Sequence, residues 1–250
     1  MSSIGKSEKF RQNETFKCLI QPKMEEVFRK DYSLKNRWKK DLFGNSNPIV
    51  LELGCGKGEY TIALAQLNPN INYIGIDIKG ARLWKGAKFV ENNNISNVRF
   101  IRTSIDFIES LFGKDEVDEI WLTFSDPQLN SPRKRLTSSM FLPRYKKFLA
   151  TNGTIHLKTD SRFLHEYTFA IAKQNGMKVD CKCVDIYGDK AKDKQIPDIV
   201  TSVQTFYEKM FIKMGLKITY LSFHLNQSDA KICEPEWDVD YWKNIEAQGR

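Results

Sequence analysis

The chain has 250 residues, a formal net charge of +8 and 41% hydrophobic residues. This length suits one α/β domain with terminal extensions, which can bury a sizeable core without disulfides or metal. No apolar run approaches the ~20 residues that cross a bilayer, and the first residues lack the apolar stretch of a signal peptide. The five cysteines form no C-x-x-C pair, so we expect a reduced, cytoplasmic protein without a metal site. Since no long apolar run is present, we also expect no membrane segment.

Strand-like and helix-like segments alternate after residue 48. Strands are expected at 49–53, 73–77, 98–102, 119–124, 154–159, 178–185 and 218–223, and helices at 81–92, 140–149, 163–171 and 206–214. This alternation is typical of an α/β fold with a mostly parallel sheet and helices on both faces. The first 47 residues break the pattern and are expected to form a basic arm with short helices, and 187–203 to form a long loop. Cys181 and Cys183 are expected at alternating positions of a strand.

Positive charge is concentrated in two segments. Residues 1–47 carry 11 Lys and Arg against 6 Asp and Glu. Residues 127–150 contain no acid, and their six basic residues are Arg133, Lys134, Arg135, Arg144, Lys146 and Lys147. Such an excess beside a ligand-binding face favours a nucleic acid as partner. The alternative, that each segment is only a solvated charged surface, stays open.

The segment LELGCGKG, residues 51–58, follows the first expected strand. Its glycines Gly54, Gly56 and Gly58 allow a tight turn and a close approach of the backbone to a ligand. Asp77 lies at the end of the second strand, where a carboxylate can accept hydrogen bonds from both hydroxyls of a ribose. This arrangement predicts a site for a nucleoside-containing ligand.

The acids around this turn narrow the choice of ligand. A dinucleotide-binding turn has the pattern G-x-G-x-x-G, whereas this chain has G-x-G-x-G with Glu59 at the sixth position. Glu52, inside the preceding strand, would repel a pyrophosphate but suits a ligand with a cationic end. S-adenosylmethionine has an ammonium, a sulfonium and a ribose and carries no phosphate, so we predict this cofactor rather than NAD. A plain strand-to-helix turn and an NAD-dependent oxidoreductase remain the alternatives.

Polar residues also follow the later strands. Ser104, Asp126 and Asp160 come directly after the third, fourth and fifth expected strands. Ligands bind at the carboxyl ends of the strands in such folds, so these residues are expected to converge with Glu52 and Asp77 on one edge of the sheet. This convergence predicts an active site.

With these residues, the motifs FSDPQLNSPRKRLT (124–137), HLKTD (156–160) and TFYE (205–208) make the chain resemble the bacterial tRNA (guanine-N7)-methyltransferases. The resemblance extends from about Phe10 to Phe223. It implies a Rossmann-like class I methyltransferase fold, α/β, with a mostly parallel seven-stranded sheet and one antiparallel strand. It also implies methyl transfer from S-adenosylmethionine to N7 of guanosine 46 in the variable loop of tRNA. The methyltransferase domain would span 48–225, between a basic N-terminal extension at 1–47 and a C-terminal tail at 226–250.

The same resemblance implies a role for each matching residue. Glu52 would lie near the methionine part of the cofactor, Asp77 at the ribose and Ser104 beside the adenine, with the glycines of the turn completing the cofactor site. Asp126 would face both the cofactor and the target guanine and would be catalytic. The residues implied in tRNA binding are Asn130, Arg133, Lys134, Arg135, Asp160, Thr205, Phe206, Tyr207 and Glu208.

The FSDP segment departs in part from the family pattern. Ser125 replaces a proline, and Asn130 replaces a common lysine. Gln128 occupies the position at which relatives have either an aromatic residue or Gln. The triplet Arg133–Arg135 is expected to supply the missing positive charge. The alternatives are a catalytically degenerate tRNA-binding module and a methyltransferase of the class that methylates exocyclic amines. We expect a monomer or a homodimer.

Overall fold

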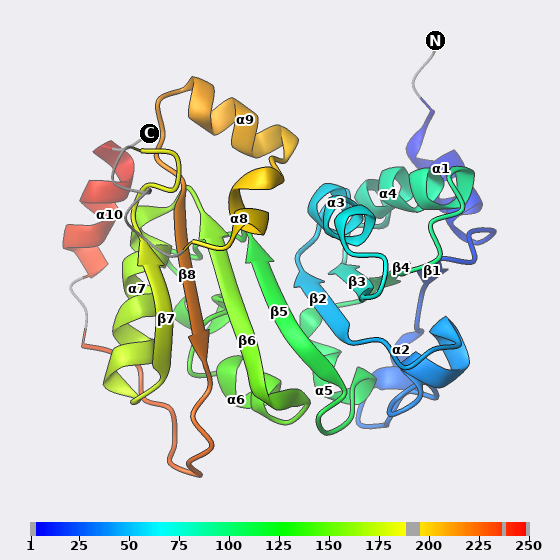
Figure 1. Ribbon diagram of the computed structural model, residues 1–250, viewed down its shortest axis with the longest axis horizontal. Coiled ribbons are helices and arrows are strands. Elements are labelled where there is room, and N and C mark those ends of the chain that lie inside the picture. Colours follow the sequence, from blue (N-terminus) through cyan, green and yellow to red (C-terminus); the bar gives the residue numbers. More distant parts are fainter. Residues whose placement is uncertain (1–3, 189–195, 237–238, 249–250) are drawn as a thin grey trace. The chain divides into compact units, whose positions relative to one another are not determined.

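The computed structural model describes residues 4–188, 196–236 and 239–248. Contacts divide the chain into two compact units, Met1–Asp118 and Glu119–Arg250, and each is described by itself (Figure 1). The elements of the first unit are α1 Lys6–Asn13, β1 Leu19–Ile20, α2 Met24–Val27, the π-helix η1 Trp38–Phe43, β2 Ile49–Leu53, α3 Glu59–Leu67, β3 Asn72–Asp77, α4 Gly80–Asn92, β4 Val98–Arg102, the 3-10 helix η2 Ile105–Phe107 and α5 Ile108–Leu111.

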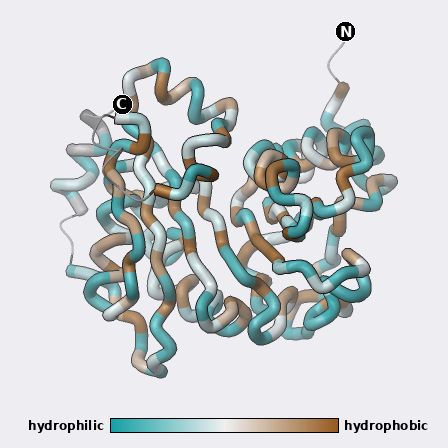
Figure 2. The backbone as a smooth tube through the Cα atoms, in the orientation of Figure 1, coloured by the Kyte–Doolittle hydropathy of each residue, from teal (hydrophilic) through white to brown (hydrophobic). Residues whose placement is uncertain are grey.

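The strands of the first unit lie in the order β1-β4-β3-β2, and their pairings are parallel. Every residue of β2 and β3 is buried, because these strands are covered on both faces, as parallel strands usually are. Figure 2 shows the hydrophobic positions that follow from this along β2. Helices α3 and α4 pack against β3 and β4 and place the turn after β2 beside the end of β3.

The N-terminal extension folds as part of the first unit. Its short helices are confirmed, and it adds the strand β1, which pairs Leu19 with Phe100 of β4. Two residues are too few to produce a periodic pattern, so the sequence does not predict this strand. The Trp38 side chain is fully buried and donates a hydrogen bond from Nε1 to the carbonyl of Leu111 at 2.7 Å. The extension therefore supplies core residues as well as charge.

The second unit contains the later elements. They are β5 Val117–Thr123, which begins just before it, the 3-10 helix η3 Pro132–Lys134, α6 Leu142–Lys146, β6 Leu149–Thr159, α7 Arg162–Gln174, β7 Lys178–Cys183, α8 Asp198–Ser202, α9 Phe206–Lys213, β8 Thr219–His224 and α10 Val239–Gln248. Its strands lie in the order β5-β6-β8-β7. β8 is antiparallel to both β6 and β7, with Phe223 opposite Ile155 and Val179. The expected antiparallel strand is thus confirmed as β8.

The elements of the second unit differ in part from those expected from the sequence. β6 begins at Leu149 rather than at residue 154, and Gly153 lies inside it, where a Cβ would come within 2.6 Å of Leu149 Cγ. The expected helix at 140–149 is accordingly shorter. Cys181 and Cys183 lie on β7, as predicted, and the structure shows that both are buried. The expected loop at 187–203 contains α8, and its part at 189–195 lies outside the described residues.

Hydrogen bonds hold the C-terminal tail against other segments of the second unit. The Asn175 side chain donates to the carbonyl of Cys233 and accepts from its N–H, both at 2.8 Å. Glu234 accepts a hydrogen bond from the N–H of Ser139 at 2.8 Å. Among the helices of the described residues, none combines the length and the apolar character that crossing a bilayer requires.

Candidate functional site

The turn after β2 is built from glycines in the left-handed region. Gly54, Gly56 and Gly58 have φ angles of 78°, 58° and 72°, which side-chain-bearing residues adopt at a cost. Gly58 is the N-cap of α3, and a Cβ there would lie 2.4 Å from ring atoms of Phe100. A Cβ on Gly54 or Gly56 would meet nothing within 4 Å. Gly58 is therefore needed for packing, whereas Gly54 and Gly56 border open space that a ligand can fill.

Glu52 is a buried carboxylate at the start of this turn, only 4% exposed. It accepts a hydrogen bond from the N–H of Thr61 at 2.8 Å and a short one from the Thr61 hydroxyl. Because Gly58 has no side chain to cap α3, Glu52 satisfies an N–H in the first turn of the helix from the neighbouring strand. Its negative charge is thereby fixed beside the turn.

Asp77 ends β3 and is 8% exposed. Its Oδ2 accepts a hydrogen bond from the N–H of Gly56 at 2.9 Å, and its Oδ1 accepts one from the N–H of Lys79 at 2.7 Å. The structure thus brings Asp77 onto the glycine turn. Burial, followed by the charges of Glu52 and Asp77, raises the pKa of the Cys55 thiol well above its ordinary value, so Cys55 stays protonated between the two acids.

Ser104 follows β4 and is the N-cap of η2. Its Oγ accepts from the N–H of Asp106 and donates to Asp106 Oδ2 at 2.9 Å. The turn after β4 therefore presents a third carboxylate, that of exposed Asp106, in addition to those of Glu52 and Asp77.

Together, these residues of the first unit fit S-adenosylmethionine. The open backbone at Gly54 and Gly56 can accept a nucleoside. The Asp77 carboxylate suits ribose hydroxyls, and Glu52 favours a cationic group over a phosphate. This charge pattern is the observation that distinguishes the ligand from a dinucleotide.

Asp126 lies in the loop that follows β5 in the second unit. It is exposed, and its Oδ1 accepts a hydrogen bond from the N–H of Gln128 at 2.9 Å. Phe124 and Gln128 on either side have φ angles of 50° and 48°, a strained conformation for residues other than glycine that is frequent at functional sites. The loop therefore holds the Asp126 carboxylate outward in a defined turn.

The basic triplet after this loop separates into two kinds of residue. Arg133 and Lys134 are exposed, as is Asn130, but Arg135 is only 2% exposed. The Arg135 guanidinium lies over the rings of Phe163 and Tyr167, at 4.7 and 4.5 Å from their centroids. Arg135, which the resemblance implies in tRNA binding, is thus buried with its charge over two aromatic rings, whereas Arg133 and Lys134 are exposed.

Arg135 instead fastens the loop that carries Asp126. Its Nε donates to the carbonyl of Pro127 at 3.1 Å, and its Nη2 donates to the carbonyl of Leu129 at 3.2 Å. These bonds connect the residue that ends η3 to the segment directly after Asp126, and the ring contacts place the same guanidinium against α7. Arg135 thus holds the backbone directly after the candidate catalytic carboxylate.

The TFYE segment begins α9. The Thr205 hydroxyl accepts from the N–H of Glu208 at 3.2 Å, and Glu208 Oε2 accepts from the N–H of Thr205 at 3.3 Å, which forms a capping box. Phe206 and Tyr207 are 60% and 44% exposed. Glu208 is fully buried, so of the four residues the two aromatic ones are the most available for contact with a partner.

Glu208 is the centre of a buried polar cluster that sequence reasoning did not find. Its Oε1 lies 2.7 Å from the Lys158 ammonium and accepts a hydrogen bond from the Tyr187 hydroxyl at 2.7 Å. Lys158 also donates to the carbonyls of Val200 at 2.6 Å and Val203 at 2.9 Å. Burial lowers the pKa of the Lys158 ammonium, and Glu208 opposes this shift. The only signal in the sequence was a lysine inside the apolar strand of HLKTD.

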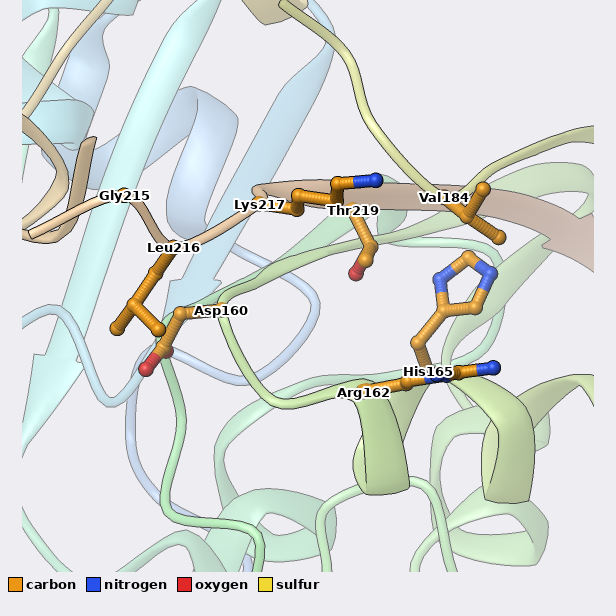
Figure 3. A pocket seen from close by; sticks show the side chains of 8 residues that line it. All are labelled: Asp160, Arg162, His165, Val184, Gly215, Leu216, Lys217 and Thr219. Atoms are coloured by element: carbon orange, nitrogen blue, oxygen red, sulfur yellow. The ribbon is translucent and has the colours of Figure 1, made fainter. Parts of the chain in front are cut away.

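Asp160 lines a pocket of about 410 Å³ in the second unit. Figure 3 shows its lining residues, with Asp160 and Arg162 at the junction of β6 and α7 and Gly215 to Thr219 leading into β8. His165 and Val184 complete it together with Leu216 and Lys217. Among the tRNA-binding residues implied by the resemblance, Asp160 is the one that belongs to this pocket.

Comparison with solved structures identifies the fold. The chain is similar to the 16S rRNA methyltransferase KamB, with a TM-score of 0.52 at 12% identity over 90% of this chain and 95% of that one. It is also similar to a SAM-dependent methyltransferase from Aquifex aeolicus, with a TM-score of 0.50 at 15% identity over 90% and 100% of the two chains. The fold is that of the class I S-adenosylmethionine-dependent methyltransferases, which confirms the fold class predicted from the sequence. The expected number of seven strands was too low, because β1 adds an eighth.

Comparison with known sequences identifies the family. A family model described as "Putative methyltransferase" matches residues 46–221. The tRNA (guanine-N(7)-)-methyltransferase of Christiangramia forsetii is 48% identical over 90% of this chain and 100% of its own length. That of Bacteroides fragilis is 42% identical over 94% and 91%. The chain belongs to the tRNA (guanine-N(7)-)-methyltransferase family.

Proposed function

We propose that this protein transfers a methyl group from S-adenosylmethionine to N7 of a guanosine in tRNA, namely guanosine 46 in the variable loop. The observation that supports this most is the likeness to a tRNA (guanine-N(7)-)-methyltransferase along that relative's full length. The glycine turn with Glu52 and Asp77 gives it a cofactor site. We also propose 48–225 as the methyltransferase domain.

The first unit binds and orients the cofactor in this proposal. Asp77 accepts hydrogen bonds from the ribose, Glu52 faces the methionine part and Ser104 lies beside the adenine. When bound, S-adenosylmethionine supplies an electrophilic methyl group. No residue has to act as a general base, because guanine N7 has an in-plane lone pair and no proton.

Asp126 orients the acceptor. Its carboxylate accepts hydrogen bonds from the guanine N1–H and the 2-amino group. These bonds strengthen as positive charge develops on the ring, so they favour the transition state over the ground state. Positioning of N7 provides the rest, and this effect can reach ~7–11 kcal/mol in well-oriented reactions. Exposed Arg133 and Lys134 contact RNA phosphates, with Asn130, Asp160 and the Thr205–Tyr207 segment around the base.

The test is incubation of the protein with unmodified tRNA and methyl-labelled S-adenosylmethionine, followed by chemical cleavage at N7-methylguanosine. We expect label in the tRNA and a single cleavage at position 46. A tRNA with adenosine at position 46 is the matched control and should take up no label. Cleavage at another guanosine would overturn the assignment of position 46, and tRNA binding without label would indicate a degenerate module.

A further inference from the structure

The N-terminal helix α1 is fixed on α4 within the first unit (Figure 1). The buried Asn13 side chain donates to the carbonyl of Gly80 at 2.9 Å, and Trp84 Nε1 donates to Gln12 Oε1 at 2.9 Å. The Arg102 guanidinium lies 4.6 Å from the ring centroid of Phe10. These contacts fix the C-terminal half of α1 against α4 and the end of β4.

Basic residues are frequent on these two helices and at the N-cap of α4. The set of Lys6, Lys9, Lys79, Arg82, Lys85 and Lys88 is called the α1–α4 cluster below. The acids on these helices are already engaged. Glu8 binds Arg11 and Gln12, and Glu91 accepts from the N–H of Cys18 at 2.7 Å. Across the described residues of both helices, positive charge is therefore left in excess at this surface.

Trp84 lies at the centre of the cluster. The ammonium of Lys9 on α1 lies 5.2 Å from its ring centroid, and that of Lys88 on α4 lies 5.0 Å away. Cation–π attraction at such distances is worth ~0.5–1 kcal/mol at an exposed site. The indole thus contacts one positive charge from each helix, and both charges remain available to an anion at this surface.

The cluster continues towards the cofactor turn. α4 begins at Gly80, three residues after the Asp77 carboxylate, and Lys79 joins the two. A polyanion bound along α4 would therefore run beside the cofactor site of the same unit. The positive charges of the cluster are spaced along two helices, which suits a chain of phosphates better than a single small anion.

We propose that the α1–α4 cluster is a docking surface for the tRNA phosphate backbone, with Lys9 and Lys88 held by Trp84 as its central contact. This inference rests on the proposed function and adds a second RNA-binding surface, in the first unit, to Arg133 and Lys134 in the second. Phosphate contacts release counterions, so each contact that is lost lowers the salt dependence of binding by close to one unit of slope.

The test measures tRNA affinity at several salt concentrations for the full chain and for two charge-reversal variants. K9E/K88E removes the two cations that contact Trp84, and R82E/K85E changes two other exposed residues of α4. For each variant we expect at least about tenfold weaker binding at low salt and a salt slope smaller by about one to two units. Cofactor affinity and thermal unfolding should stay close to those of the wild type for R82E/K85E.

The matched control is K30E/K40E, which makes the same charge change at exposed lysines of the first unit outside the cluster. Its effect on the salt slope should be clearly smaller. Equal slopes for R82E/K85E and the wild type, or equal effects in R82E/K85E and the control, would overturn the docking surface. A wild-type protein that methylates no tRNA would instead overturn the proposed function, so the two failures are distinguishable.

Discussion

The Lys158 ammonium and the Glu208 carboxylate lie 2.7 Å apart, and both side chains are fully buried. The pair connects the middle of the second unit's sheet to the first turn of α9. Through the carbonyls of Val200 and Val203, Lys158 also holds the end of α8 and the residue after it. One buried ion pair therefore holds the TFYE segment, at the start of α9, against β6.

Breaking this pair should be costly because it leaves an uncompensated buried charge. We expect Lys158→Met and Glu208→Gln each to lower the free energy of unfolding by about 3–5 kcal/mol in urea titrations. The double variant should lose clearly less than the sum of the two. Lys178→Met, at the exposed pair of Lys178 and Asp180, serves as control and should cost under about 1 kcal/mol. Additive effects in the double variant would contradict coupling between Lys158 and Glu208.

The glycines of the cofactor turn should respond differently to alanine. Gly54→Ala places its Cβ in open space at a φ of 78°, so we expect a strain of about 1–2 kcal/mol and weaker S-adenosylmethionine binding. Gly44→Ala is the matched control, since it has a φ of 68° and equally open surroundings outside the turn. It should lose similar stability and keep cofactor affinity, measured by calorimetry.

Gly58→Ala adds a clash to this strain, because its Cβ would lie 2.4 Å from Phe100 ring atoms. We expect it to lower the unfolding temperature more than either of the other two alanine variants. If Gly58→Ala were as stable as Gly44→Ala, the Phe100 ring would not be the constraint that makes a glycine necessary there.

Much of this architecture was predictable because buried parallel strands leave a strong apolar pattern. The strand at Ile49–Leu53 and its glycine turn are found with the predicted bounds. β1 was not predictable, because two residues carry no periodicity. Glu52 shows a subtler limit, since sequence spacing indicates a carboxylate near the ligand but cannot show that Thr61 binds it.

Charge patterns were the least reliable guide to the site. In the triplet after FSDP, the sequence gives no means of telling Arg135 from Arg133. What separates them is the pair of rings at Phe163 and Tyr167, about thirty residues further along the chain. Likewise, the resemblance implies Glu208 in tRNA binding, and its burial becomes clear only from the ion pair with Lys158, fifty residues earlier in the chain.

The triplet can be tested residue by residue. Arg133→Ala/Lys134→Ala should weaken tRNA binding and lower its salt slope with unchanged stability, because both side chains are exposed. Arg135→Ala should instead destabilise the protein by about 2 kcal/mol or more, since it loses two hydrogen bonds and the contacts with two rings. Arg135→Lys keeps the charge but cannot reproduce the paired bonds. A large fall in salt slope with unchanged stability in Arg135→Ala would show that the guanidinium reaches RNA after all.

Substitution of Asp126 by Asn should impair methyl transfer while leaving the stability of the protein nearly unchanged. Asp126→Asn keeps an oxygen that can accept the hydrogen bond from the N–H of Gln128, so the turn should persist. The amide also presents an N–H₂ group and no charge to the guanine edge, so we expect kcat to fall by about 10²-fold or more. Because the residue is exposed, stability should change by no more than about 0.5 kcal/mol, and the Kd for S-adenosylmethionine should not change.

Asp126→Ala removes the turn-forming oxygen as well, and the comparison with Asp126→Asn isolates that loss. Single-turnover methyl transfer to unmodified tRNA measures the chemical step for both variants. We expect both to be slow and Asp126→Ala to bind tRNA more weakly, since the loop before Gln128 loses its internal hydrogen bond. Near-normal single-turnover rates in Asp126→Asn would show that the carboxylate serves only the turn, and the acceptor-orienting group would then have to be sought elsewhere in the second unit.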